Sequence, residues 1–209
     1  MYRLQEEEDG EETPQPRPVE AERNAAAMTD AVRDRLFEAR TLIISGEINQ
    51  KLVSHVMGQL LAMAAADGKK PITIFINSQG GHVESGDTIH DVIRFIEPRV
   101  RMVGTGWVAS AGALIYVSVP REDRYALPNT RFLLHQPAGG ASGMAADVEI
   151  EAREILRMRE RINKIFARET GQPFERIETD THRNFWLMAE QAVEYGLVGK
   201  VIKGVNELE

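Results

Sequence analysis

Short apolar runs alternate with helical segments along most of this sequence, and that alternation restricts the fold more than any other feature. Apolar residues recur at helical spacing over 53–64 and 89–96, and each segment is followed by a compact apolar run, at 72–76 and 100–103 respectively. Another apolar run occupies 131–134. Strands joined through helices of this length need crossover connections and pair in parallel. The sequence therefore predicts an α/β fold with a mainly parallel sheet and flanking helices.

Residues 144–168 predict one long, highly charged helix that follows a glycine-rich stretch at 137–143. This helix carries more apolar residues than a single surface helix on a compact domain needs. The surplus indicates a protruding helix that buries part of its length against another subunit. A core helix with ordinary solvation is the alternative.

The first 27 residues differ in composition from the rest of the chain. They hold eight acidic residues, three arginines and three closely spaced prolines. A segment of this kind cannot bury enough apolar surface to offset its chain entropy. We therefore predict a disordered acidic tail at 1–27 and one folded domain at 28–209.

Composition also excludes several classes of function. The chain has no cysteine, which removes disulfides and thiolate chemistry and fits a cytoplasmic location. No basic stripe with aromatic residues is present, so we expect no nucleic-acid partner. An uncharged stretch at 102–120 is long enough to span a bilayer, but its glycines and serines favour a strand and a tightly packed helix. We expect no membrane association.

Ser110 lies among small residues at a predicted strand-to-helix junction. A serine there can lie next to free backbone N–H groups, which stabilise developing negative charge. Tight helix packing explains the same small residues, so this motif alone leaves both interpretations open.

Two further elements favour catalysis. A glycine pair follows the predicted strand at 72–76, so the N–H groups of Gly81 and Ala111 could flank one carbonyl oxygen as an oxyanion hole. His135 directly follows the apolar run at 131–134. Histidine can take a proton from serine near neutral pH and return it to a leaving amine.

Across roughly residues 29–203 the sequence resembles the proteolytic subunit of the Clp protease. The matching motifs are INSQGG at 76–81, ASAGA at 109–113, ALPN at 126–129, HQP at 135–137, EAREI at 151–155 and EYGLV at 194–198. The resemblance implies a crotonase-like fold with Ser110 as nucleophile, His135 as base, and Gly81 and Ala111 as oxyanion donors.

The resemblance also implies partners. It predicts a homo-oligomer of two stacked heptameric rings and an AAA+ unfoldase that uses ATP and feeds in polypeptide substrates, so this chain itself needs no cofactor and no metal. A second proteolytic subunit is a further candidate partner. The family's unfoldase-docking surface corresponds to Thr73, Phe75 and Phe95, and Thr73 weakens that patch.

The third catalytic position departs from the family pattern. Where the family has an aspartate, this chain has Asn184 at the end of the run DTHRN at 180–184. The carboxamide oxygen can accept a hydrogen bond from the imidazole, but it cannot offset the charge of an imidazolium. Three hypotheses follow: a slower Ser-His-Asn site, rescue by Asp180, or a weakly active or inactive paralogue that modulates a partner proteolytic subunit. An acyl-CoA hydratase or isomerase on the same fold is a fourth.

Overall fold

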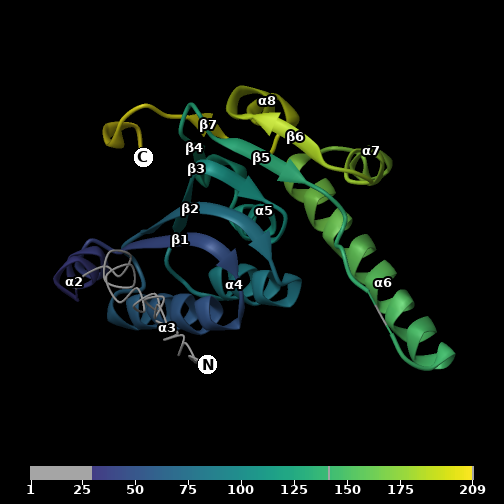
Figure 1. Cartoon of the computed structure of the whole chain (residues 1–209). Helices are drawn as coiled ribbons and strands as arrows, with labels where there is room; N and C mark the ends of the chain where they lie inside the picture. Colours follow the sequence, from purple (N-terminus) through teal and green to yellow (C-terminus); the bar gives the residue numbers. More distant parts are fainter. Residues whose placement is uncertain (1–29, 141, 209) are drawn as a thin grey trace, which may run out of the picture.

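The computed structural model describes residues 30–140 and 142–208, and its centre is a seven-stranded sheet (Figure 1). Five strands lie in one parallel array, in the order β1 (Thr41–Ile48), β2 (Ile72–Gly81), β3 (Val100–Ala109), β4 (Arg124–Ala126) and β7 (Lys200–Val201). The predicted mainly parallel α/β fold is therefore confirmed. The acidic tail predicted at 1–27 lies outside the described residues.

Strand β3 changes partners along its length. Its first half pairs with β4, and its last three residues pair in parallel with β5 (Arg131–Leu134). β5 in turn pairs with β6 (Phe185–Met188), which runs antiparallel and which the sequence did not predict. This side branch of the sheet leads directly to the candidate site.

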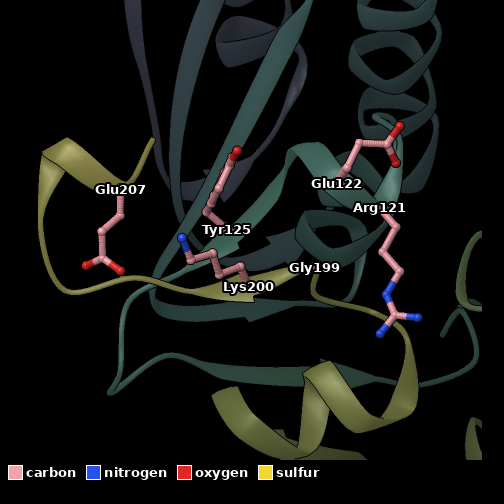
Figure 2. A pocket seen from close by; sticks show the side chains of 6 residues that line it. All are labelled: Arg121, Glu122, Tyr125, Gly199, Lys200 and Glu207. Carbon is pink, nitrogen blue, oxygen red and sulfur yellow. The ribbon is translucent and has the colours of Figure 1, made fainter. Parts of the chain in front are cut away.

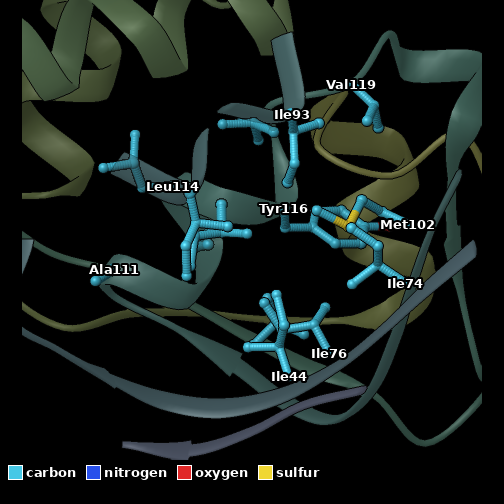
Figure 3. Close-up of a cluster of buried hydrophobic side chains, with 14 of the residues drawn as sticks. Ile44, Ile74, Ile76, Ile93, Met102, Ala111, Leu114, Tyr116 and Val119 are labelled. Carbon is cyan, nitrogen blue, oxygen red and sulfur yellow. The ribbon is translucent and has the colours of Figure 1, made fainter. Parts of the chain in front are cut away.

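Helices α3 (Gln50–Ala66), α4 (Val83–Phe95) and α5 (Ala111–Tyr116) cover one face of the sheet (Figure 1). Alternate residues of β2 point to this face, so Ile74 and Ile76 are fully buried. Figure 3 shows these isoleucines together with Leu114 and Tyr116 of α5 in the main hydrophobic core. Because α5 is buried along its whole length, the residue that precedes it is held firmly in place.

The long helix α6 (Ala145–Thr170) extends away from the sheet (Figure 1). Its C-terminal half packs on the core through Ile162 and Phe166. In its N-terminal half, Ile150 is 56% exposed and Leu156 is 60% exposed. The predicted protruding helix is therefore confirmed, and apolar side chains remain uncovered along its outer part.

A buried arginine fixes the C-terminal end of α6. The side chain of Arg124 is fully buried and donates hydrogen bonds to the carbonyl oxygens of Val119 and Glu169, and to the Glu169 carboxylate. Burial of a charge is tolerated when it is paired and hydrogen-bonded in this way. Strand β4 and the end of α6 are thereby joined.

The remaining elements are short. They are α2 (Asp30–Glu38), α7 (Phe174–Asp180), α8 (Ala189–Tyr195) and two 3-10 turns, η1 (Arg121–Asp123) and η2 (Val205–Glu207). Over the described ranges, none of the helices has both the length and the apolar character that a membrane crossing requires.

Candidate active site

Ser110 occupies a strained turn between β3 and α5. Its φ is 56°, a left-handed conformation that residues other than glycine rarely adopt. The turn is fixed by hydrogen bonds: the Ser110 N–H donates to Leu133 O at 2.9 Å, and the Ser110 carbonyl accepts from the N–H groups of Ala113 and Leu114. Ala111 is the first residue of α5, so its N–H has no acceptor within the helix.

The glycine pair at the end of β2 permits a close approach to this turn. A β-carbon added to Gly80 would lie 2.6 Å from the β-carbon of Ser110, and the φ of Gly80 is +95°. A β-carbon on Gly81 would lie 2.3 Å from the carbonyl oxygen of Ile48. Both positions therefore require glycine for steric reasons, in addition to the donor role that the sequence predicted for Gly81.

Gln79, which precedes the glycine pair, ties this loop to β1 through its side chain. With its amide turned to satisfy both groups, Gln79 donates to Gly46 O at 3.2 Å and accepts from Glu47 N at 3.1 Å. Ser78 also donates to Gly46 O, at 2.6 Å, and accepts from Gly80 N. These bonds hold the loop against the bulge in β1.

The three predicted triad residues lie at the ends of three neighbouring strands. Ser110 follows β3, His135 follows β5, and Asn184 precedes β6. In the antiparallel pair of β5 and β6, Leu134 is opposite Phe185. Regular pairing stops there, one residue short of His135 and Asn184, and both of these residues line one cavity.

His135 lines two adjacent cavities. The smaller, of about 10 Å³, it shares with Ser110 and with apolar residues of α5 and α6, including Leu114 and Phe166. The other, of about 230 Å³, it shares with Asn184. Ser110 and His135 are half-buried and Asn184 is exposed. Within the described chain, no hydrogen bond joins the side chains of these three residues.

Burial lowers the pKa of His135 below its ordinary value of 6.5. Desolvation disfavours the charged imidazolium, and no carboxylate of the described residues offsets that effect. The imidazole is therefore neutral at physiological pH and able to accept a proton.

Asp180 has other partners. Its carboxylate accepts a 2.7 Å hydrogen bond from the hydroxyl of Tyr195 and lies 3.5 Å from Nε of Arg176. Burial, together with this hydrogen bond, raises the pKa of Tyr195. These contacts disfavour the hypothesis that Asp180 replaces the missing aspartate.

A second surface lies on the face of the sheet opposite α3, α4 and α5. There Val103, Tyr125 and Ile202 form a small apolar cluster, against which Phe75 packs. Beside the cluster is a pocket of about 390 Å³, and Figure 2 shows the side chains of Tyr125 and Lys200 among those that line it.

The docking residues predicted from the sequence have different environments. Thr73 and Phe75 are partly buried, and Phe95 is 81% exposed. Sequence analysis did not identify Tyr125 or Ile202 as members of this cluster, because Tyr125 lies in the three-residue strand β4 and Ile202 directly follows the two-residue strand β7.

The described residues contain no group of three or more histidine or acidic side chains that could hold a metal ion. A strained serine at a strand-to-helix turn, with a neutral histidine at the end of the adjacent strand, is instead typical of hydrolases that use a serine nucleophile.

Comparison with known proteins narrows that class. The sequence profile of the Clp protease family matches residues 23–205, and the chain belongs to this family of serine peptidases. It is 61% identical over 167 residues to ATP-dependent Clp protease proteolytic subunit 3 of Rhizobium etli, covering 80% of this chain and 86% of that protein. It is 54% identical over 172 residues to subunit 2 of Pseudomonas aeruginosa, covering 82% and 85%.

Solved structures of Clp protease subunits have the same fold as this chain. ClpP1 from Listeria monocytogenes superposes with a TM-score of 0.77 at 53% identity, covering 85% of this chain and 99% of that one. An asparagine-to-aspartate mutant of the same protein gives a TM-score of 0.80 with the same identity and coverage. The predicted Clp protease fold is confirmed, and membership of a peptidase family disfavours the acyl-CoA hypothesis.

Proposed function

We propose that this chain is the proteolytic subunit of an ATP-dependent protease and that it cleaves polypeptides with Ser110, His135 and Asn184. The observation that carries the assignment is the strained Ser110 turn beside a cavity lined by His135. A residue other than glycine is held at positive φ only where its surroundings enforce it, and such strain is concentrated at functional sites.

In this mechanism His135 takes the proton of the Ser110 hydroxyl as its oxygen attacks the peptide carbonyl. The N–H groups of Gly81 and Ala111 stabilise the oxyanion that forms. The imidazolium then gives its proton to the departing amine, which leaves an acyl-enzyme. His135 then takes a proton from a water molecule, whose oxygen attacks the acyl carbon. The imidazolium returns that proton to the Ser110 oxygen as the acyl–oxygen bond breaks, which frees the new C-terminus and restores the serine. Asn184 accepts a hydrogen bond from the other imidazole nitrogen and so orients the ring.

The test is hydrolysis of a short fluorogenic peptide by the full chain and by Ser110→Ala. Ser118→Ala is a matched control, because the Ser118 hydroxyl is buried without a hydrogen-bond partner and lies just after α5. We expect Ser110→Ala to abolish cleavage and Ser118→Ala to retain it. Retained cleavage by Ser110→Ala would refute the assignment.

The proposed assembly is two stacked heptameric rings of this chain with an AAA+ unfoldase that consumes the ATP. The uncovered apolar residues of α6 support contact with another subunit. The partly exposed Phe75, which packs on the buried cluster of Val103, Tyr125 and Ile202, offers part of a docking surface for the unfoldase. Mass measurement in solution should give about fourteen subunits, whereas a monomer at micromolar concentration would contradict the assembly. The cytoplasmic location remains a prediction.

One observation favours a second candidate, a weakly active subunit that modulates a partner proteolytic subunit. Asn184 supplies no charge, and burial is the single cause of the shifted His135 pKa. Peptide hydrolysis by the chain alone and mixed with a second proteolytic subunit separates the two, if Ser110→Ala is compared in both cases. In a purely modulating subunit, Ser110→Ala would leave the activity of the mixture unchanged.

A further inference from the structure

We propose that Gln136 is a positioning residue that sets the alignment of His135 with Asn184. This inference rests on the proposed function, because it concerns the same site. It assigns to Gln136 a role that acts through the pair rather than on the substrate.

Gln136 bridges the two segments that carry the pair. Its backbone N–H donates to Thr181 O at 2.7 Å, and its side-chain Nε2 donates to His182 O, also at 2.7 Å. Both are short for N–H···O bonds. Gln136 directly follows His135 in the chain, and the acceptor of its side-chain bond, His182, lies two residues before Asn184.

The turn that leads to Asn184 has little else to hold it. The backbone N–H of His182 bonds weakly to Thr179 O at 3.3 Å, and His182, Arg183 and Asn184 are all exposed. Among the described residues, no side chain other than that of Gln136 is hydrogen-bonded to positions 182–184. Regular pairing of β6 begins only with Phe185, one residue later.

On its other side the turn is firmly anchored. Thr181 is fully buried, and its hydroxyl bonds to Asn163 of α6 at 3.0 Å and to Ile177 O at 2.7 Å. Residues 182–184 therefore connect the fixed Thr181 to the fixed start of β6. The Gln136 amide is the side-chain bond that determines where this short connection lies relative to His135.

Asparagine makes this alignment more important than aspartate would. A carboxylate attracts an imidazolium over several ångströms, whereas a carboxamide interacts through a dipole that must point its oxygen at the ring N–H. No such bond is formed in the structure, so the backbone must bring the two groups within reach during catalysis.

The experiment is a double-mutant cycle on the full chain, with kcat and KM measured on a short fluorogenic peptide. Gln136→Ala removes the amide bond and keeps the backbone bond to Thr181. Gln172→Ala is the matched control, because its Nε2 makes the same kind of bond, to Tyr195 O at 2.9 Å, away from the site. Both variants are compared with the parent in solution mass.

We expect Gln136→Ala to lower kcat roughly fivefold to tenfold with KM unchanged, in line with the loss of one hydrogen bond that acts on the transition state. Gln172→Ala should stay within about twofold of the parent. In an Asn184→Ala background, Gln136→Ala should change kcat less than about twofold, because the residue it positions is gone. Gln136→Met, which keeps the side-chain length, adds no charge and cannot donate to His182 O, should behave as Gln136→Ala does.

Equal losses of kcat in the parent and in the Asn184→Ala background would overturn the positioning role, as would an effect on KM alone. If Gln136→Ala disrupts assembly, the uncharged Gln136→Met variant supplies the same comparison. The rate at which a fluorophosphonate labels Ser110 provides a second measure of each variant. A parent chain that neither cleaves peptide nor takes the label contradicts the proposed function itself, so the two failures are distinguishable.

Discussion

Replacing Asn184 with aspartate tests whether the site lacks only a charge partner. A carboxylate at this position would hold the imidazole N–H and stabilise the imidazolium that forms as Ser110 attacks, whereas the carboxamide offers a dipole. Because the imidazolium forms after the substrate binds, the gain should appear in kcat rather than in KM.

The size of the gain follows from the exposure of the pair. Two unit charges about 4 Å apart attract by about 4 kcal/mol at an effective dielectric constant near 20, and by about 1 kcal/mol in bulk water. His135 is half-buried and Asn184 is exposed, so the pair lies between these limits. An attraction of about 2 kcal/mol corresponds to a roughly 30-fold increase in kcat.

The assay is peptide hydrolysis by the assembled particle as a function of pH. Asn184→Asp should also raise the pKa of His135, so that the acidic limb of the pH–rate profile moves to higher pH. Asn129→Asp, an exposed substitution before the opposite end of β5, adds the same charge away from the site and should leave kcat unchanged. An unchanged kcat in a correctly assembled Asn184→Asp particle would refute the idea that charge is what the site lacks.

Three further predictions follow from the geometry. Gly80→Ala should reduce peptide cleavage at least 100-fold, because the added β-carbon would lie 2.6 Å from the β-carbon of Ser110. Gly140→Ala, whose β-carbon would meet no atom within 4 Å, should leave cleavage unchanged. Wild-type cleavage by Gly80→Ala would contradict the close approach. Arg124→Met should destabilise the fold by about 3 kcal/mol, since the carbonyl oxygens of Val119 and Glu169 lose the donor that Arg124 supplies and the Glu169 carboxylate keeps Arg94 and Arg168 as its remaining partners. An unchanged thermal unfolding midpoint would count against the anchor. Burial lowers the pKa of His135 below 6.5, so kcat/KM should fall only below pH 6.5 as the imidazole gains its proton; a midpoint above 6.5 would show that the base is not in this environment.

Local patterns determined much of what could be predicted. The strands β2 and β3 begin where the apolar runs begin, and the helices α3 and α4 follow the helical spacing of their apolar residues. Ser110 and His135 were identifiable because each directly follows such a strand. Strands and helices are indicated by patterns within a few consecutive residues, so the positions of Ser110 and His135 at strand ends could be predicted from the local sequence.

Features that depend on pairing between distant segments were not predictable in this way. The strand β6 has four residues and no clear alternation, and its antiparallel pairing with β5 joins positions about fifty residues apart. That pairing brings Asn184 and His135 to the same end of β5 and β6, where both line one cavity. The contact of Gly80 with Ser110 and the bonds of Gln136 to the turn at 181–182 likewise depend on the completed sheet.

The central claim is that the strained turn presents Ser110 as a nucleophile activated by His135. Its most direct test is labelling of the assembled protein with a fluorophosphonate, followed by peptide mass spectrometry to locate the modified residue. We predict one label per chain on Ser110, lost in Ser110→Ala and strongly slowed in His135→Ala. A label on another residue, or peptide cleavage that persists while Ser110 stays unmodified, would contradict the account.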